Sequence, residues 1–253
     1  MEIWLIVFAV LCSFAFEFID TSLGGGYGTI LTPVFLAINL DIFYIVPSIL
    51  LSEIFTGIFG ALSHHWFGNT DFNEPNRTNY KVLAMIGISG VIASFFTVFL
   101  ALQLNKTIIK TYIGILVLVV GILMLRAKRY EFSWKKLGAI GLISSFNKAL
   151  SGGGFGPLVT AGQVVSGRDV KSSIATALAC EVPVCIAGLF GYILLNGWFN
   201  PILSILLIIG SVPATFVGAL ATKKIGNEKT LRRVVGTFVV FLGIFALLKT
   251  YVF

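Results

Sequence analysis

The chain has 253 residues, of which 57% are hydrophobic and 11% are charged. This composition excludes a soluble globular domain, which needs far more polar surface, and predicts an all-α polytopic membrane protein embedded in a lipid bilayer. The formal net charge of +7 does not indicate a nucleic-acid partner. The basic residues come in short bursts between apolar runs, as in membrane proteins that follow the positive-inside rule.

The first half of the chain is expected to contain five segments. The first two lie at roughly 3–19 and 27–39 and flank Gly24, Gly25 and Gly26. Both are short for a helix that crosses a bilayer core of about 30 Å, so they are predicted to form a re-entrant helical hairpin with the glycines at its tip. Three longer apolar runs predict transmembrane helices at roughly 42–63, 80–102 and 108–126.

The second half shows the same order of segments. Two short ones at roughly 134–148 and 155–166 flank a second glycine triplet and predict a second glycine-tipped hairpin. Three further transmembrane helices are predicted at roughly 171–195, 199–222 and 231–251.

The two halves are related by a shift of 128 residues. The shift places Glu53 on Glu181, and it superposes the stretch Gly24-Gly25-Gly26-Tyr27-Gly28 on Gly152-Gly153-Gly154-Phe155-Gly156. A motif of this length that occurs twice indicates an internal repeat. Because five segments per repeat is an odd number, the repeats 1–130 and 131–253 are predicted to be inverted within one membrane domain.

The basic residues predict the orientation of the chain. Bursts at 126–136 and 223–233, together with the connections 64–81 and 166–171, are expected to face the cytoplasm. Both termini then lie outside, and the protein is predicted to be a multi-pass protein of the cell (plasma) membrane.

The two glycine tips are predicted to meet near the bilayer midplane. Helices that begin at Tyr27 and Phe155 would direct the positive ends of their dipoles and open amides toward a shared cavity, which favours an anion. We therefore expect the substrate to be bound by the tips and by side chains beside them, namely Gly24, Gly25, Gly26, Tyr27, Lys148, Ser151, Gly152, Gly153, Gly154 and Phe155. The alternative is that these glycines only allow close packing of helices.

Five ionisable residues lie inside apolar segments, where a charge costs about 2.5–3.5 kcal/mol at a helix centre. Glu53 and Glu181 occupy equivalent positions, and with Asp20 they are predicted to carry a proton coupled to transport. The alternative for the glutamates is a structural hydrogen bond from a protonated acid. Lys148 is equivalent to Asp20, and it would either pair with Asp20 or face the anion. Glu17 is expected to be solvated near the outer interface.

Other chemistry has less support in the sequence. Cys12, Cys180 and Cys185 lack the paired spacing of a zinc or redox site, so no metal or cofactor is expected. A membrane-embedded enzyme would need a nucleophile and a base, and the sequence contains neither Gly-x-Ser-x-Gly nor His-Glu-x-x-His. We therefore expect no enzymatic activity, and an anion channel built from the same hairpins remains the alternative to a carrier.

A further motif follows the third segment and reads Gly60-Ala61-x-x-His64-His65-x-x-Gly68-Asn69-x-Asp71. Together with the doubled glycine hairpins, it resembles the TauE/SafE sulfite exporter family, also called the 4-toluene sulfonate uptake permeases, over nearly the whole chain. The resemblance implies secondary transport of small sulfur-containing anions such as sulfite, thiosulfate, sulfonates or sulfoacetate, coupled to protons. His64 and His65 are expected at a cytoplasmic helix end, solvated or in contact with phosphate.

Overall fold

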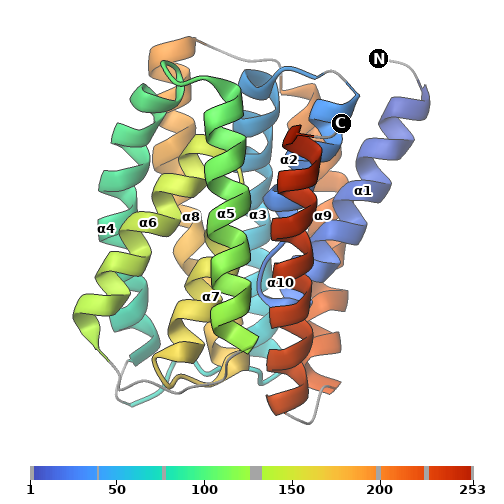
Figure 1. Ribbon diagram of the computed structural model, residues 1–253. Helices are drawn as coiled ribbons and strands as arrows, with labels where there is room; N and C mark the ends of the chain where they lie inside the picture. The colour runs from blue at the N-terminus through green and yellow to red at the C-terminus, as the bar shows by residue number, and fades with distance from the viewer. Residues whose placement is uncertain are drawn as a thin grey trace.

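The computed structural model describes residues 3–38, 40–75, 78–125, 133–197, 201–224 and 228–251. Within these ranges the chain forms ten α-helices and no strand (Figure 1). The helices are α1 (Ile3–Leu23), α2 (Tyr27–Ala37), α3 (Ile42–Trp66), α4 (Thr78–Ala101), α5 (Lys106–Leu125), α6 (Trp134–Ser151), α7 (Phe155–Val165), α8 (Val170–Asn196), α9 (Ile202–Lys224) and α10 (Glu228–Tyr251).

Five of the described helices are long and apolar enough to cross a membrane, namely α1, α3, α4, α8 and α9. The prediction of an all-helical, multi-pass membrane protein is therefore confirmed. The inverted orientation of the two halves and the division near residue 130 stay predictions.

The first helix is longer than predicted. It runs to Leu23 and has 21 residues, so α1 is long enough to span a bilayer core by itself. The predicted segment ended near residue 19, beside Glu17 and Asp20. Both residues are buried, and the helix continues past them. Glu17 Oε1 accepts from the Thr21 hydroxyl and Asp20 Oδ1 from the Tyr27 N–H, whereas Glu17 Oε2 has no partner among the described residues. The first hairpin thus joins one long helix to the short α2.

Two helices begin at aspartates that the shift of 128 superposes. Asp41 precedes α3 and accepts a hydrogen bond from the Phe43 N–H at 2.8 Å. Asp169 precedes α8 and accepts from the Ser172 N–H, also at 2.8 Å. A carboxylate at this position satisfies an amide that has no partner inside the helix and opposes the positive end of the helix dipole. The long central helices of both halves therefore start with the same local chemistry.

The packing of the helices follows the correspondence between the halves. Helix α1 packs against α9 as α6 packs against α4, and α3 packs against α9 as α8 packs against α4. The pairs α3 with α8 and α5 with α10 join equivalent helices. The short helices α2 and α7 occupy opposite halves of the bundle's height (Figure 1). This arrangement is what two related halves would produce.

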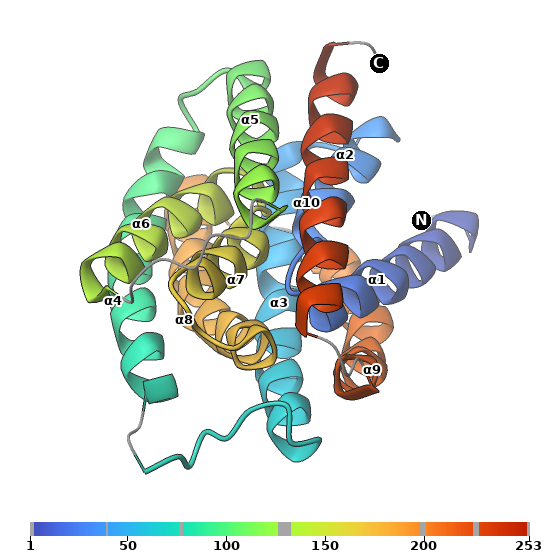
Figure 2. The same ribbon diagram turned by 60° about the horizontal axis from the view of Figure 1, so that its bottom comes forward.

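The two ends of the bundle differ in the chain segments and in many of the basic residues that they carry. Helix α1 begins and α10 ends at one end of the bundle, whereas α6 and α8 begin and α9 ends at the other (Figures 1 and 2). Lys135, Lys171 and Lys223 belong to this second end, where the Lys171 ammonium donates to the Lys223 carbonyl at 3.2 Å. By the positive-inside rule, the end with Lys135, Lys171 and Lys223 would face the cytoplasm, which stays a prediction.

Candidate functional site

The two glycine turns contact each other directly inside the bundle. A β-carbon on Gly28 would lie 1.7 Å from the carbonyl oxygen of Gly152, and one on Gly153 would lie 2.7 Å from Cα of Thr29. Gly152 and Gly154 have φ of 74° and 79°, which side chains rarely adopt. Glycine is therefore required for the backbone path and for the contact between the hairpins, and α2 and α7 begin at Tyr27 and Phe155 as predicted.

Most of the tip amides have partners within the protein. The N–H groups of Gly24 and Gly25 donate to the Asp20 carbonyl at 2.8 and 3.1 Å, and the Tyr27 N–H donates to Asp20 Oδ1 at 3.0 Å. In the second turn, Gly153 donates to Ser151 Oγ at 3.1 Å.

The Gly154 N–H donates across the contact to Thr29 Oγ1 at 2.9 Å. The expectation of open amides at the tips is therefore wrong for this structure. The backbone amides that were expected to bind an anion donate to acceptors within the packed turns, because each buried amide needs an acceptor. Whether the tips bind substrate when they separate stays a prediction.

A buried lysine connects the second hairpin to the two central helices. Lys148 on α6 is 1% exposed and forms ion pairs with Glu53 on α3 and Glu181 on α8. Its Nζ atom lies 2.6 Å from Glu181 Oε1. The two glutamates equated by the repeat thus meet at one ammonium group.

Of the two readings of Lys148, pairing with Asp20 is wrong, because its ion pairs are with Glu53 and Glu181, and facing the anion stays a prediction. Asp20 Oδ1 instead accepts from the Tyr27 N–H, at the start of α2. Lys148 and Asp20 have equivalent positions in the repeat and opposite charges, but the long lysine side chain extends to α3 and α8. The alternative role of Glu53 and Glu181, a structural hydrogen bond from a protonated acid, must also be revised. Each carboxyl group contacts the Lys148 ammonium and does not rely on a neutral hydrogen bond alone.

The same cluster contains the atoms of a conceivable metal site. Donor atoms of Glu53, Glu181 and Cys185 lie within 4.8 Å of one another. Both carboxylates already contact the Lys148 ammonium, which supplies the positive charge that a metal ion would otherwise provide. We therefore assign the cluster to an ion-pair centre and not to a metal.

A chain of hydroxyl groups lies next to the first turn. The Tyr27 hydroxyl is 3.0 Å from Ser13 Oγ and 3.1 Å from Ser52 Oγ, so it joins α1, α2 and α3. Glu17 is 1% exposed and accepts from the Thr21 hydroxyl at 2.6 Å. The expectation that Glu17 is solvated is wrong, because it lies on the buried face of α1 together with Ser13.

His64 is fully buried as well, although it was expected to be solvated. Its Nδ1 lies 3.1 Å from Asn69 Nδ2, and its Nε2 lies 2.9 Å from the Thr21 carbonyl. An amide nitrogen only donates and a carbonyl only accepts, so the imidazole is neutral with its proton on Nε2. Asn69 also donates to the Ala219 carbonyl at 2.7 Å. His65 is half-buried, with Nδ1 3.9 Å from Asp71 Oδ1.

Arg168 holds the connection between α7 and α8 in place. Its guanidinium donates to Asn79 Oδ1, and Asn79 Nδ2 donates to the Asp71 carbonyl at 2.7 Å. Burial lowers the pKa of Arg168, while the nearby Glu74 carboxylate opposes this shift. The contact joins the connection between α7 and α8 to the first turn of α4. Through Asn79 it also reaches the connection between α3 and α4, whose path Figure 2 shows.

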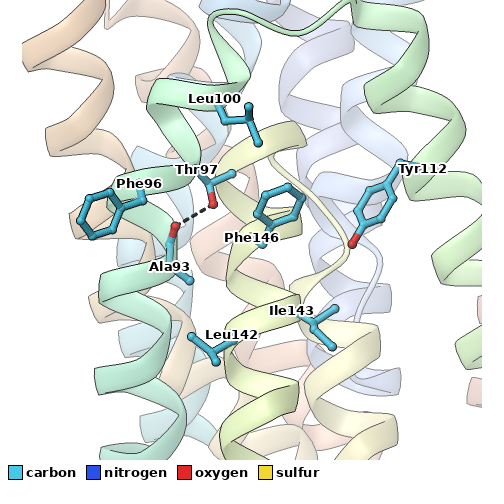
Figure 3. A pocket seen from close by; sticks show the side chains of 8 residues that line it. All are labelled: Ala93, Phe96, Thr97, Leu100, Tyr112, Leu142, Ile143 and Phe146. Atoms are coloured by element: carbon cyan, nitrogen blue, oxygen red, sulfur yellow. Dashed lines mark hydrogen bonds between the residues drawn. The ribbon is translucent and has the colours of Figure 1, made fainter.

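A groove of 490 Å³ between α4, α5 and α6 is not part of this site (Figure 3). It is lined by Ala93, Phe96, Thr97, Leu100, Tyr112, Leu142, Ile143 and Phe146. The Thr97 hydroxyl donates to the Ala93 carbonyl at 2.6 Å, so it is occupied within its own helix. None of the described residues that line the groove is charged, so these side chains offer no counter-charge to a small anion.

Comparison with known proteins gives two matches and one negative result. The family model described as "Sulfite exporter TauE/SafE" matches residues 9–246. A Bacillus subtilis protein named "Probable membrane transporter protein YtnM" is 26% identical, over 98% of this chain and 84% of the relative. No solved structure matches. The matches point to a membrane transporter and not to an enzyme. The chain belongs to the sulfite exporter TauE/SafE family.

Proposed function

We propose that this membrane transporter is a secondary carrier of small sulfur-containing anions of the sulfite, thiosulfate, sulfonate or sulfoacetate class, coupled to protons. The observation that carries the proposal is the buried ion-pair centre, in which Lys148 contacts Glu53 and Glu181 beside the meeting point of the hairpins. The family match and the name of the relative support transport. The family's description supports sulfite, and the wider class of sulfur-containing anions is what the resemblance of the sequence implies.

The charge balance of the buried region supports proton coupling. Among the residues whose side chains are described, the buried carboxyl groups are those of Glu17, Asp20, Glu53 and Glu181, whereas Lys148 is the only buried ammonium. An uncompensated charge in this environment is costly. An entering anion would add further negative charge, and proton uptake by a carboxyl group would offset it. Protonation of one glutamate would also free part of the Lys148 ammonium for the anion.

Alternating access is proposed to depend on separation of the hairpins. With the turns in contact, the amides at the tips bond within the protein. If one hairpin moved away from the other, the N-terminus of α2 or α7 would face the resulting cavity and favour an anion. A carrier fits this closed contact better than a channel, which needs a continuous path.

Uptake into proteoliposomes tests the proposal. Vesicles with the purified protein would receive labelled sulfite, thiosulfate, methanesulfonate or sulfate, with and without a pH gradient. We expect saturable uptake of at least one sulfur anion, accumulation driven by the gradient, and loss of accumulation with a protonophore. Uptake that never saturates would favour a channel. Uptake that is the same with and without the pH gradient would contradict proton coupling.

A further inference from the structure

Asn147, on α6 immediately before Lys148, is a fully buried amide that bonds to nothing in the described structure. Its side chain is 0% exposed, and neither Nδ2 nor Oδ1 has a hydrogen-bond partner among the described residues. Buried side-chain amides are nearly always hydrogen-bonded, because an unsatisfied polar group loses its interactions with water without replacement. An orphaned donor and acceptor at one position therefore require an explanation.

The position of Asn147 points to a ligand at the start of α7. A β-carbon on Gly154 would lie 3.3 Å from Asn147 Cβ and 3.7 Å from its Nδ2. Gly154 is the residue immediately before α7, a helix of 11 residues. The first amides of a helix have no partner within it, and the helix dipole makes this end favourable for an anion. The unpaired amide is thus next to a region that suits negative charge.

The corresponding position in the first half argues against a packing role. The shift of 128 places Ile19 opposite Asn147. An apolar side chain therefore fills the equivalent position in the first hairpin. The second hairpin instead carries a polar group with two unsatisfied atoms, next to the residue that carries the buried ammonium. An amide at this position is useful only if something polar contacts it.

We propose that Asn147 directly binds the transported oxyanion at the N-terminus of α7. Nδ2–H donates to one oxygen of the anion, and Oδ1 accepts from an O–H of a protonated anion or of its bound water. This proposal rests on the proposed function and adds a substrate-binding residue to it. It makes the second hairpin, and not the first, the side of the site that recognises the anion.

The test compares stability with binding in the same variants. Asn147→Leu and Asn147→Ala remove the amide, and Ser204→Ala removes a buried unpaired hydroxyl in the first turn of α9 as a control. The melting temperature of each purified protein would be measured alone and with sulfite, thiosulfate, methanesulfonate, sulfate or phosphate. An anion that binds the folded protein raises its melting temperature in a concentration-dependent way.

We expect at least one of these anions to stabilise the unmodified protein and the Ser204→Ala variant equally. Without anion, Asn147→Leu should melt at the same temperature as the unmodified protein or higher, because it no longer buries an unpaired amide. Its affinity for the anion should fall at least tenfold. Asn147→Ala should lose affinity similarly, which covers the case in which leucine does not fit.

Two outcomes would overturn the proposal. One is anion affinity in either Asn147 variant within twofold of the unmodified protein. The other is that none of the five anions stabilises the unmodified protein. Failure of the proposed function looks different, because an anion would then bind and depend on Asn147 but would not be transported into proteoliposomes.

Discussion

The carbonyl oxygen of Gly152 occupies the place that a β-carbon on Gly28 would take, with only 1.7 Å between them. The obstruction is backbone, so it cannot be relieved by a change of rotamer. The two hairpins can therefore touch only while position 28 is glycine. Since Gly28 lies inside α2, alanine there is compatible with the helix, and its cost comes from the contact alone.

We predict that Gly28→Ala destabilises the protein by about 1–3 kcal/mol, as overpacking typically does, and stops anion uptake. Gly138→Ala is the matched control, because its β-carbon would lie 3.8 Å from Met85 Sδ, an ordinary contact. Melting temperature and proteoliposome uptake would be measured for both. Normal uptake by Gly28→Ala would show that the contact between the hairpins is dispensable.

The ion-pair centre predicts a charge rescue. Lys148→Met leaves the Glu53 and Glu181 carboxylates close together without a cation, and removing one partner of a buried pair typically costs about 3–5 kcal/mol. Adding Glu53→Gln and Glu181→Gln should restore much of the lost stability by removing the unpaired charge. The triple variant should fold without transporting. If Lys148→Met melts like the unmodified protein, the ion pairs do not contribute to stability.

The single glutamine variants separate coupling from structure. Two carboxylates contact one ammonium, so Glu53→Gln or Glu181→Gln leaves a one-to-one ion pair and removes one group that can carry a proton. We expect loss of accumulation driven by a pH gradient, while exchange of anion for anion, which needs no net proton movement, survives. Unchanged gradient-driven accumulation in both single variants would contradict a proton-carrying role.

The order and type of the helices could be predicted from the sequence, but several contacts could not. Glycine triplets interrupt helices, and this placed the starts of α2 and α7 at Tyr27 and Phe155. The predicted first segment ended near residue 19, whereas α1 runs to Leu23. The burial of Glu17 was also missed, because a charged residue looks solvated until its neighbours are known. Thr21, four residues after Glu17, donates to Glu17 Oε1 within the same helix, while Oε2 has no partner among the described residues.

The residues of the candidate site were predicted from the sequence more fully than the contacts among them. The repeat singled out Glu53 and Glu181, and the cost of a buried charge singled out Lys148. Their meeting was not predicted, because the repeat equates Lys148 with Asp20 and thereby suggested that pair. Which carboxylates Lys148 contacts depends on how far its side chain extends, and this is visible only in the three-dimensional structure. Asn147 carried no signal in the sequence, since a single asparagine in a helix is unremarkable until both its polar atoms are found unpaired.

The orientation of the chain predicts a labelling pattern. Asn196 and Lys224 are exposed at the ends of α8 and α9, on opposite sides if the basic end faces the cytoplasm. After replacement of Cys12, Cys180 and Cys185, a cysteine at position 196 should react with an impermeant thiol reagent added to intact cells. One at position 224 should react only after the membrane is opened. The reverse pattern would invert the assignment of the two sides.

The contacts of His64 predict that this residue has a structural role at the C-terminal end of α1, the long helix of the first hairpin. The carbonyl of Thr21, in the last turn of α1, receives the His64 Nε2–H at 2.9 Å, and the next carbonyl, that of Ser22, accepts from the Thr222 hydroxyl at 3.0 Å. The last carbonyls of a helix have no partner within it. These side chains therefore hold the end of α1, directly before Gly24, against α3 and α9.

We predict that His64→Ala lowers the free energy of unfolding by about 1–3 kcal/mol. It removes the shorter of two hydrogen bonds to the buried Thr21 carbonyl, which keeps only the Thr222 hydroxyl at 3.4 Å, and one of the two acceptors of Asn69 Nδ2. His65→Ala is the control, since His65 is half-buried and its closest carboxylate, that of Asp71, is largely exposed. Melting temperatures would be compared first, and uptake would then be measured at a temperature at which both variants are folded. We expect His64→Ala to transport more slowly at that temperature as well. The glycine turn that contacts the second hairpin follows directly after the end of α1, and this variant removes one of the contacts that hold that end. Equal melting temperatures for the two variants would mean that the buried imidazole does not hold the end of α1.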